Sequence, residues 1–244
     1  QRIATVEGLR ANCLLPDGDD VLVGTSEAHL LRLSDGSLQP VEPFERTPGR
    51  ESWHTPWGGP PDVRTLSRGV DGTLYANVHV GGVARSEDGG DTWTDTMDIH
   101  ADVHQVLAHP TEPGLVVAAA AIGLGISTDS AQSWRFEAEG LHGTYLRAVT
   151  IAAQTVVVSA SSGSGGRQAC VYRRALDGNG EFHRCRDGLP EWFSDNVDSA
   201  CLDASGSSVV LGAPDGTIYV SADEGESWAE TARGLPPVRC VSFA

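Results

Sequence analysis

Short apolar runs recur along the whole chain, each bounded by Gly, Pro, Asp or Asn. Runs of this length and composition are typical of β-strands, so we expect an all-β protein with negligible helix. Each repeat is predicted to contain four strands. The second strands are predicted over residues 21–24, 73–80, 115–122, 155–160 and 208–212, and the third strands over 29–33, 82–86, 123–127, 170–174 and 217–221.

An eight-residue pattern, S-x-D-x-G-x-x-W, follows the third strand of several repeats. It occupies residues 86–93, 127–134 (with Ala131 at the Gly position) and 221–228, and residues 175–182 carry a degenerate copy. Asp and Ser side chains can bond turn amides, Gly supplies a positive φ, and Trp covers the hairpin. We therefore interpret the pattern as a hairpin turn and Trp93, Trp134 and Trp228 as structural anchors.

The spacing of these turns predicts the architecture. The Asp residues at 35, 88, 129, 177 and 223 lie 41 to 53 residues apart, which is typical of four-stranded propeller blades. The pattern resembles the Asp-box of the BNR-repeat propellers, a family that includes sialidases, sortilin-type receptors and photosystem assembly factors. The resemblance implies a single-domain β-propeller over residues 1–244, with six antiparallel four-stranded blades, or five as the alternative.

The two chain ends are expected to share the sixth blade. Residues 2–9 match residues 228–235, an outer strand, while residues 238–244 begin like an innermost strand. Joining both ends in one blade would leave no open edge. The second and third strands of that blade would then come from an N-terminal piece that was cleaved or left out. Otherwise five blades and a spare strand remain.

One polar residue per repeat follows an apolar residue where each innermost strand is expected to start. In a ring, these residues would surround the mouth of the channel and could clamp a carboxylate or a phosphate. Alternatively, the Arg side chains pair with nearby Asp and hold the blades together. The series is Arg10, Arg64, His104, Arg147, Asp198 and Arg239.

The BNR resemblance also implies that ligands bind on the face opposite the repeated turn, where residues 43–61, 139–145 and 187–196 form long connections. The aromatic and histidine side chains there either wall a pocket or pack the neighbouring blades. These candidates are Trp53, His54, Trp57, Tyr145 and Trp192. We expect any ligand to contact Arg64, His104 and Arg147 beneath the 43–61 connection.

Histidines near the same face are candidate metal ligands. Zinc, iron or copper would need three or four ligands from different loops, and the alternative is a set of scattered, hydrogen-bonding histidines. The spacing matches no recognised motif, so the cofactor remains unknown. The candidates are His54, His79, His104 and His142.

Charge and cysteine content narrow the partners and the location. A net charge of −16 and a pI near 4.7 argue against binding to nucleic acid or anionic membranes, and no apolar run is long enough for membrane insertion. We expect a monomer that binds a small anionic ligand, a peptide or another protein. A disulfide between Cys170 and Cys185 would indicate a secreted protein, and a reduced pair a cytoplasmic one.

Catalytic signatures are sparse. The sequence has no P-loop, no G-x-S-x-G and no C-x-x-C, and it lacks a clear match to the Tyr-Glu pair of sialidases. The favoured interpretation is a binding scaffold with an anion-friendly site at the channel mouth. The alternative is an enzyme that uses the same pocket, either a metal-dependent one with His ligands or a sialidase-like glycoside hydrolase.

Overall fold

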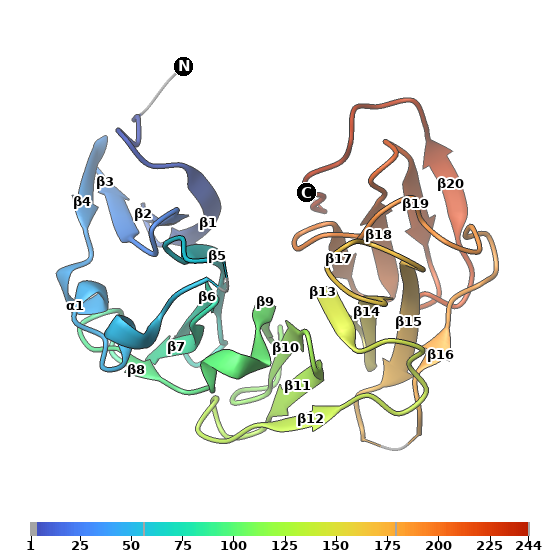
Figure 1. Ribbon diagram of the computed structural model, residues 1–244, viewed down its shortest axis with the longest axis horizontal. Coiled ribbons are helices and arrows are strands. Elements are labelled where there is room, and N and C mark those ends of the chain that lie inside the picture. The colour runs from blue at the N-terminus through green and yellow to red at the C-terminus, as the bar shows by residue number, and fades with distance from the viewer. Residues whose placement is uncertain (1–3, 56, 179, 244) are drawn as a thin grey trace. The chain divides into compact units, whose positions relative to one another are not determined.

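The computed structural model describes residues 4–55, 57–178 and 180–243 and confirms an all-β chain of antiparallel sheets (Figure 1). Within these residues, five sheets of four strands each follow one another, and strands adjacent in sequence are adjacent in each sheet. The strands are β1 (Ala11–Asp17), β2 (Asp20–Thr25), β3 (Leu30–Ser34), β4 (Ser37–Pro40), β5 (Asp62–Arg68), β6 (Leu74–His79), β7 (Gly82–Ser86), β8 (Thr94–Asp95), β9 (Val103–Ala108), β10 (Val116–Ala120), β11 (Gly123–Ser127), β12 (Arg135–Glu137), β13 (Tyr145–Ala152), β14 (Thr155–Ser161), β15 (Cys170–Ala175), β16 (His183–Arg184), β17 (Leu202–Ser205), β18 (Ser208–Gly212), β19 (Ile218–Ser221) and β20 (Ala229–Ala232).

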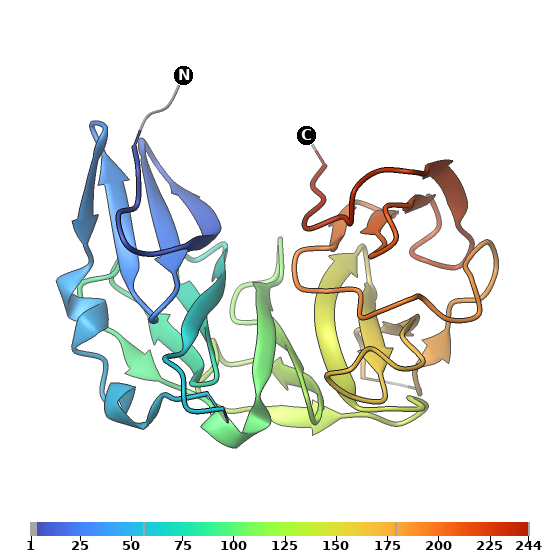
Figure 2. The same ribbon diagram turned by 45° about the horizontal axis from the view of Figure 1, so that its top comes forward.

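Helices are few and short in the described residues. The helix α1 (Glu42–Glu45) and the 3-10 helices η1 (Arg50–Ser52) and η2 (Ile99–Ala101) all lie in connections between sheets (Figure 2). The predicted second and third strands are confirmed to within one or two residues. Strands such as β10 and β14 are buried at every position, because both faces of a central strand are covered.

The repeated turns share one hydrogen-bond pattern. Ser86 Oγ donates to Asp88 Oδ1 at 2.8 Å and accepts from the Gly90 amide at 2.9 Å, while the Thr92 amide donates to Asp88 Oδ1 at 2.9 Å. The turns beginning at Ser127 and Ser221 repeat these bonds. The Ser and Asp side chains therefore replace the backbone partners that a tight turn leaves out.

The three turn tryptophans are not equally buried. Trp93 and Trp228 are 4% and 6% exposed, and each indole donates to the carbonyl three residues earlier. Trp134 is half-buried, and its indole donates instead to Thr96 Oγ1 at 3.4 Å. The expectation of three similar anchors therefore holds for two of them.

A β-bulge interrupts the first strand pair in three of the sheets. The register skips Asn12 in β1 and Arg64 in β5, and in β13 it shifts between Leu146 and Val149, so that Arg147 lies in the bulge. We call Asn12, Arg64 and Arg147 the bulge positions. Arg10, expected as the polar residue at the start of the first innermost strand, is not one of them. Arg10 precedes β1, and its guanidinium lies 3.2 Å from the Asp62 carboxylate.

The sixth blade and the start of the fifth differ from expectation. Val197 and Asp198 lie in the connection before β17 and do not open the strand. Residues 4–9 and 238–243, expected to build the sixth blade together with residues 2, 3 and 244, form no strand, and residues 1–3 and 244 lie outside the described residues. The sheet count thus matches the five-blade alternative, and a six-blade count stays a prediction.

The chain falls into two compact units, each with its own core. Unit 1 comprises residues 1–117 and 126–135, and unit 2 comprises residues 118–125 and 136–244, so the boundary runs through the third sheet. In unit 1, Phe44 packs edge-on against Trp93 and 5.7 Å from Trp53. In unit 2, Phe193 packs against Tyr219 beside Trp228.

The two candidate disulfide cysteines do not face each other. In the pairing of β15 with β16, Tyr172 lies opposite Arg184, and the Cys185 amide donates to the Val171 carbonyl. Cys170 and Cys185 therefore project from opposite faces of the sheet, because side chains alternate along a strand. Both are free thiols, and the proposed cross-strand disulfide is wrong.

Candidate functional site

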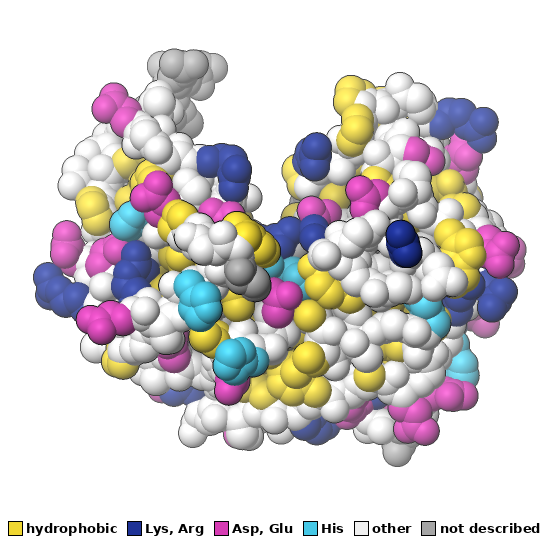
Figure 3. Space-filling view, viewed as in Figure 1, with side chains coloured by type: hydrophobic (Ala, Val, Ile, Leu, Met, Phe, Trp, Pro, Cys, Tyr) yellow, Lys and Arg dark blue, Asp and Glu magenta, His cyan; other side chains and the backbone are white. Residues whose placement is uncertain are grey.

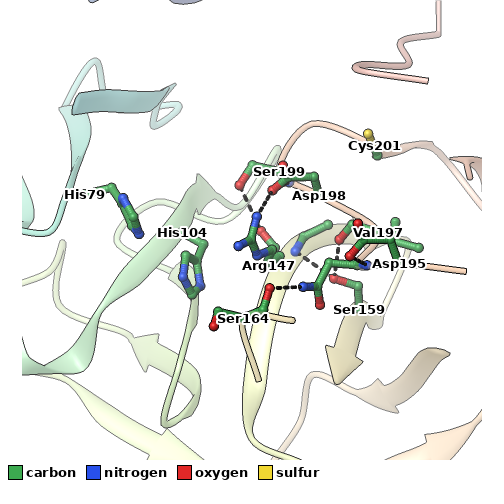
Figure 4. A network of polar contacts seen from close by, with 12 residues as sticks. His79, His104, Arg147, Ser159, Ser164, Asp195, Val197, Asp198, Ser199 and Cys201 are labelled. Carbon is green, nitrogen blue, oxygen red and sulfur yellow. Dashed lines mark hydrogen bonds and ion pairs between the residues drawn. The ribbon is translucent and has the colours of Figure 1, made fainter. Parts of the chain in front are cut away.

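In unit 1, two predicted histidines meet one aspartate, a group that we call the histidine cluster. His79 ends β6 and His104 is the second residue of β9 (Figure 4). Asp102 follows η2. Asp102 Oδ1 lies 3.2 Å from His79 Nε2 and 3.6 Å from His104 Nε2, and the two imidazole rings are 5.2 Å apart. One carboxylate oxygen thus faces two imidazole nitrogens.

The backbone and burial fix this arrangement. The His104 side chain is fully buried, whereas His79 is 12% and Asp102 28% exposed. Asp102 has φ 51°, a left-handed conformation that Asp tolerates better than most residues. Asn77 donates to the Val103 carbonyl at 2.8 Å, which ties β6 to the start of β9.

The charge of Asp102 is set by its neighbours. Burial raises the pKa of this carboxyl, but the hydrogen bond from His79 and the charges of His104, His79 and Arg64 outweigh it and leave the pKa below its usual value. Asp102 is therefore ionised at neutral pH.

The predicted aromatic cover over this cluster is partial. The Trp57 ring lies 6.0 Å from the His79 ring and is 72% exposed. Trp53 is 6% exposed in the core and donates to Asp95 Oδ2 at 3.2 Å, so it offers almost no surface to a ligand. His54 is exposed, and its Nδ1 lies 2.7 Å from the Ser52 carbonyl oxygen.

In unit 2, a cavity of about 180 Å³ surrounds three residues of the predicted polar series, and we call it the arginine cavity. Arg147 and Arg239 both line the cavity. Asp198 accepts a hydrogen bond from Arg147 Nη1 at 3.1 Å (Figure 4). The full lining is Arg147, Ser164, Asp195, Asn196, Asp198, Cys201, Gly212, Pro214, Pro237, Val238 and Arg239.

The Arg147 guanidinium is held in place with donor capacity left over. Burial lowers its pKa, but Asp198 and Tyr145 outweigh this and raise the pKa above the usual value. The Arg147 Cζ atom lies 5.5 Å from the centroid of the Tyr145 ring, which is a cation–π contact. Its Nε is buried and has no hydrogen-bond partner among the described residues.

The arginine cavity offers little for nucleophilic catalysis. Cys201 is its only thiol among the described residues, and burial raises the pKa of this thiol to about 11, so it stays protonated at neutral pH. No histidine of the described chain lines the cavity, and Asp198 is paired with Arg147.

A third group of side chains in unit 2 contains the two remaining candidate residues, His142 and Trp192. His142 Nδ1 lies 2.9 Å from the Tyr172 hydroxyl, and its ring lies 5.2 Å from the half-buried Trp192. The Arg184 guanidinium sits 3.8 Å above the Trp192 ring. Burial raises the pKa of the nearby Cys170 thiol to about 11, so this thiol is protonated at neutral pH. The group binds β15, β16 and their connections together.

The structure thus brings together some predicted residues and adds others. Arg64 and His104 belong to unit 1 and Arg147 to unit 2, and their expected joint contact with a ligand stays a prediction. Sequence reasoning missed Asp102 as a partner of histidine, although the tripeptide Asp102-Val103-His104 places both side chains at one strand start. It also missed Ser164 and Asn196, which no motif marks.

Figure 3 shows how charged side chains are distributed over one face of the molecule. On the face shown in Figure 3, acidic side chains are dispersed among basic ones, and no extended basic surface is visible. In the described part of the chain, no helix has the length and apolar character needed to cross a membrane.

Comparisons with known proteins define the class. No protein-family model matches the chain, and no curated protein matches its sequence. Among solved structures, it is similar to the WD40 β-propeller domain of Doa1 (13% identity, 93% of this chain and 69% of that chain, TM-score 0.65). It is also similar to YCF48 bound to D1 peptide (14%, 91% and 67%, 0.58) and to the GH74 xyloglucanase from Xanthomonas campestris (15%, 92% and 38%, 0.63).

The chain therefore spans 38% of the xyloglucanase chain and about two thirds of the other two. At these identities the likeness shows the fold alone, which is that of the β-propellers.

Proposed function

We propose that this protein is a BNR-type propeller that acts as a binding scaffold and holds a carboxylate-bearing peptide segment in the arginine cavity. The BNR assignment is supported by three turns with the same Ser and Asp hydrogen bonds. The scaffold assignment is supported by propeller neighbours that include one bound to a peptide.

The observation that carries the proposal is the donor set of the arginine cavity. The Arg147 side chain lines the cavity and is 19% exposed, and the exposed Arg239 lines it too and forms no ion pair with any described residue. Guanidinium groups bind carboxylates with charge-assisted, often bidentate hydrogen bonds. A carboxylate would supply acceptors for both groups.

Cavity size favours a side chain or a chain end over a large ligand. A volume of about 180 Å³ is below the roughly 300–1,000 Å³ of sites for drug-sized molecules. It can hold an Asp or Glu side chain or a peptide C-terminus. Asp195 and the Ser164 and Asn196 side chains add polar groups at its wall that could bond a peptide backbone.

A peptide-display experiment tests this function. We expect selection against the purified chain to enrich peptides with an essential carboxylate, and the amide form of each to bind at least about tenfold more weakly. Arg239→Gln and Arg147→Ala should weaken binding to the acid form only. The matched control is Arg233→Ala, because Arg233 is exposed and pairs with Glu230 outside the cavity. Equal binding of acid and amide forms would overturn the proposal.

A further inference from the structure

We propose that His79, Asp102 and His104 form a binding site for a divalent transition metal, with Zn²⁺ as the best match. This site lies in unit 1 and is independent of the peptide-binding function proposed for unit 2. The ligand atoms of all three side chains lie within 4.8 Å of one another, which is the juxtaposition on which the inference rests.

The two separations from the Asp102 carboxylate fit a shared metal, and the two imidazole nitrogens, which lie within 4.8 Å of each other, would have to approach slightly. Ligand atoms that each lie 2.0–2.2 Å from a tetrahedral zinc are about 3.3–3.6 Å apart. The Asp102 Oδ1 distances to His79 Nε2 and His104 Nε2 are 3.2 and 3.6 Å. The second distance is too long for a hydrogen bond. A metal ion between these atoms would bring both imidazoles to one centre.

The three ligands are held before any metal binds. His104 is fully buried on β9, His79 sits at the last position of β6, and the left-handed backbone at Asp102 turns this residue between η2 and β9. The bond from Asn77 to the Val103 carbonyl fixes β6 against the residue between Asp102 and His104. A prearranged set loses little conformational freedom on binding, which favours affinity.

The ligand types select the class of metal. Two imidazoles and one carboxylate suit Zn²⁺, Fe²⁺ or Co²⁺, whereas Mg²⁺ and Ca²⁺ prefer all-oxygen sites. Three protein ligands leave a fourth position for water or another small ligand, as in open zinc sites. His79 and Asp102 are partly exposed, so solvent and ions can reach the site.

One neighbour opposes a cation. The positive charge of Arg64 acts on Asp102 and would repel a divalent ion. This repulsion provides a test that separates a metal site from the anion site that the sequence suggested around Arg64 and His104. Removing the charge should strengthen the binding of a metal and weaken the binding of an anion.

The experiment titrates tag-free, metal-stripped protein with Zn²⁺ by calorimetry and with Co²⁺ by absorption spectroscopy. We expect one equivalent per chain, with ligand-field bands of four- or five-coordinate Co²⁺ and no thiolate charge-transfer band. Asp102→Asn and His79→Gln should each weaken Zn²⁺ binding about 100-fold. The control His100→Gln removes an exposed histidine outside the cluster and should leave Zn²⁺ affinity unchanged.

The Arg64→Gln variant keeps all three metal ligands and should change the Zn²⁺ affinity in the opposite direction. We expect it to bind Zn²⁺ at least about threefold more tightly than the parent. Circular dichroism and the melting temperature without metal show whether each variant is folded. Unchanged Zn²⁺ affinity in folded Asp102→Asn, a thiolate–Co²⁺ band, or weaker binding in Arg64→Gln would each overturn the proposal.

Discussion

The histidine cluster of unit 1 and the arginine cavity of unit 2 use the same part of the repeat for different chemistry. His104 and Arg147 both lie near the start of an innermost strand, but His104 is fully buried beside a carboxylate and an imidazole. Arg147 borders a cavity of about 180 Å³. Compact packing of donor atoms suits a metal ion, whereas an open, donor-lined space suits a carboxylate. The strand scaffold is shared, and in our proposals the side chains at the strand starts set the difference in ligand.

The largest predicted effect tests the shared scaffold. Trp93→Ala in unit 1 and Trp228→Ala in unit 2 should each lower the free energy of unfolding by about 3–5 kcal/mol, because each indole is buried over its own copy of the repeated turn. Trp134→Ala should lower the free energy of unfolding by clearly less, since that side chain is half-buried. Urea denaturation measures all three. Equal losses at Trp93 and Trp134 would contradict the burial argument.

A smaller predicted effect tests whether the two sites bind their ligands independently. Arg147→Ala should weaken an acidic peptide by about 1.5–3 kcal/mol, the range for hydrogen bonds to charged groups, and leave Zn²⁺ binding in unit 1 unchanged. Parallel titrations with the peptide and with Zn²⁺ measure both. A variant of normal melting temperature that loses Zn²⁺ affinity would show that the two sites are not independent.

A half-buried carboxylate in unit 1, that of Asp95, predicts that its substitution stabilises the fold. Burial raises the pKa of Asp95 from 3.8 to about 6, and the hydrogen bond from Trp53 offsets only part of this. Its Oδ1 is buried without a hydrogen-bond partner among the described residues. Because the folded pKa lies above the unfolded one, stability is lost as pH rises from 3.8 to about 6.

Asp95→Asn should therefore raise the free energy of unfolding by about 1 kcal/mol at pH 8, a value reduced for solvent screening, and by much less at pH 4. Urea denaturation at the two pH values provides the measurement. An equal effect at both would show that the charge of Asp95 is not the cause.

The smallest effect is common to the turns of both units. Hydrogen bonds from the Thr92, Ser133 and Ser227 positions lower the pKa values of Asp88, Asp129 and Asp223 from 3.8 to about 2. Folded values below the unfolded one mean that this stabilisation is complete above pH 3.8 and is lost as pH falls towards 2. Asp88→Asn should weaken the dependence of the melting temperature on pH within that window. An unchanged slope would contradict the assignment.

Much of the fold could be predicted from the sequence, because strand burial and turn chemistry are local. The second and third strands, the Ser86–Asp88 turn bonds and the burial of Trp93 follow from periodicity and from side chains that bond their own turn. The residues of the candidate sites were harder to predict than the fold. The sequence indicated Arg10 as the polar residue at the first strand start, two residues before the bulge position Asn12. A bulge shifts the register of a strand pair without changing the apolar pattern of the sequence.

Asp102 and Asn196 were missed for another reason. Their roles depend on residues from other strands or loops, such as His79 for Asp102 and Ser164 for Asn196. A single sequence carries no signal for such pairings. Trp53 was misplaced because an aromatic residue in a long connection can serve the core as readily as a ligand.

The bulge positions have an evolutionary consequence. Asn12, Arg64 and Arg147 each occupy an extra place in a strand, so the ladder on either side keeps its register whichever side chain stands there. A codon change at such a place would alter the chemistry of the strand start while the sheet stays intact. Repeats that begin as copies can then diverge one at a time, and a single chain can accumulate several unrelated specificities without a new fold.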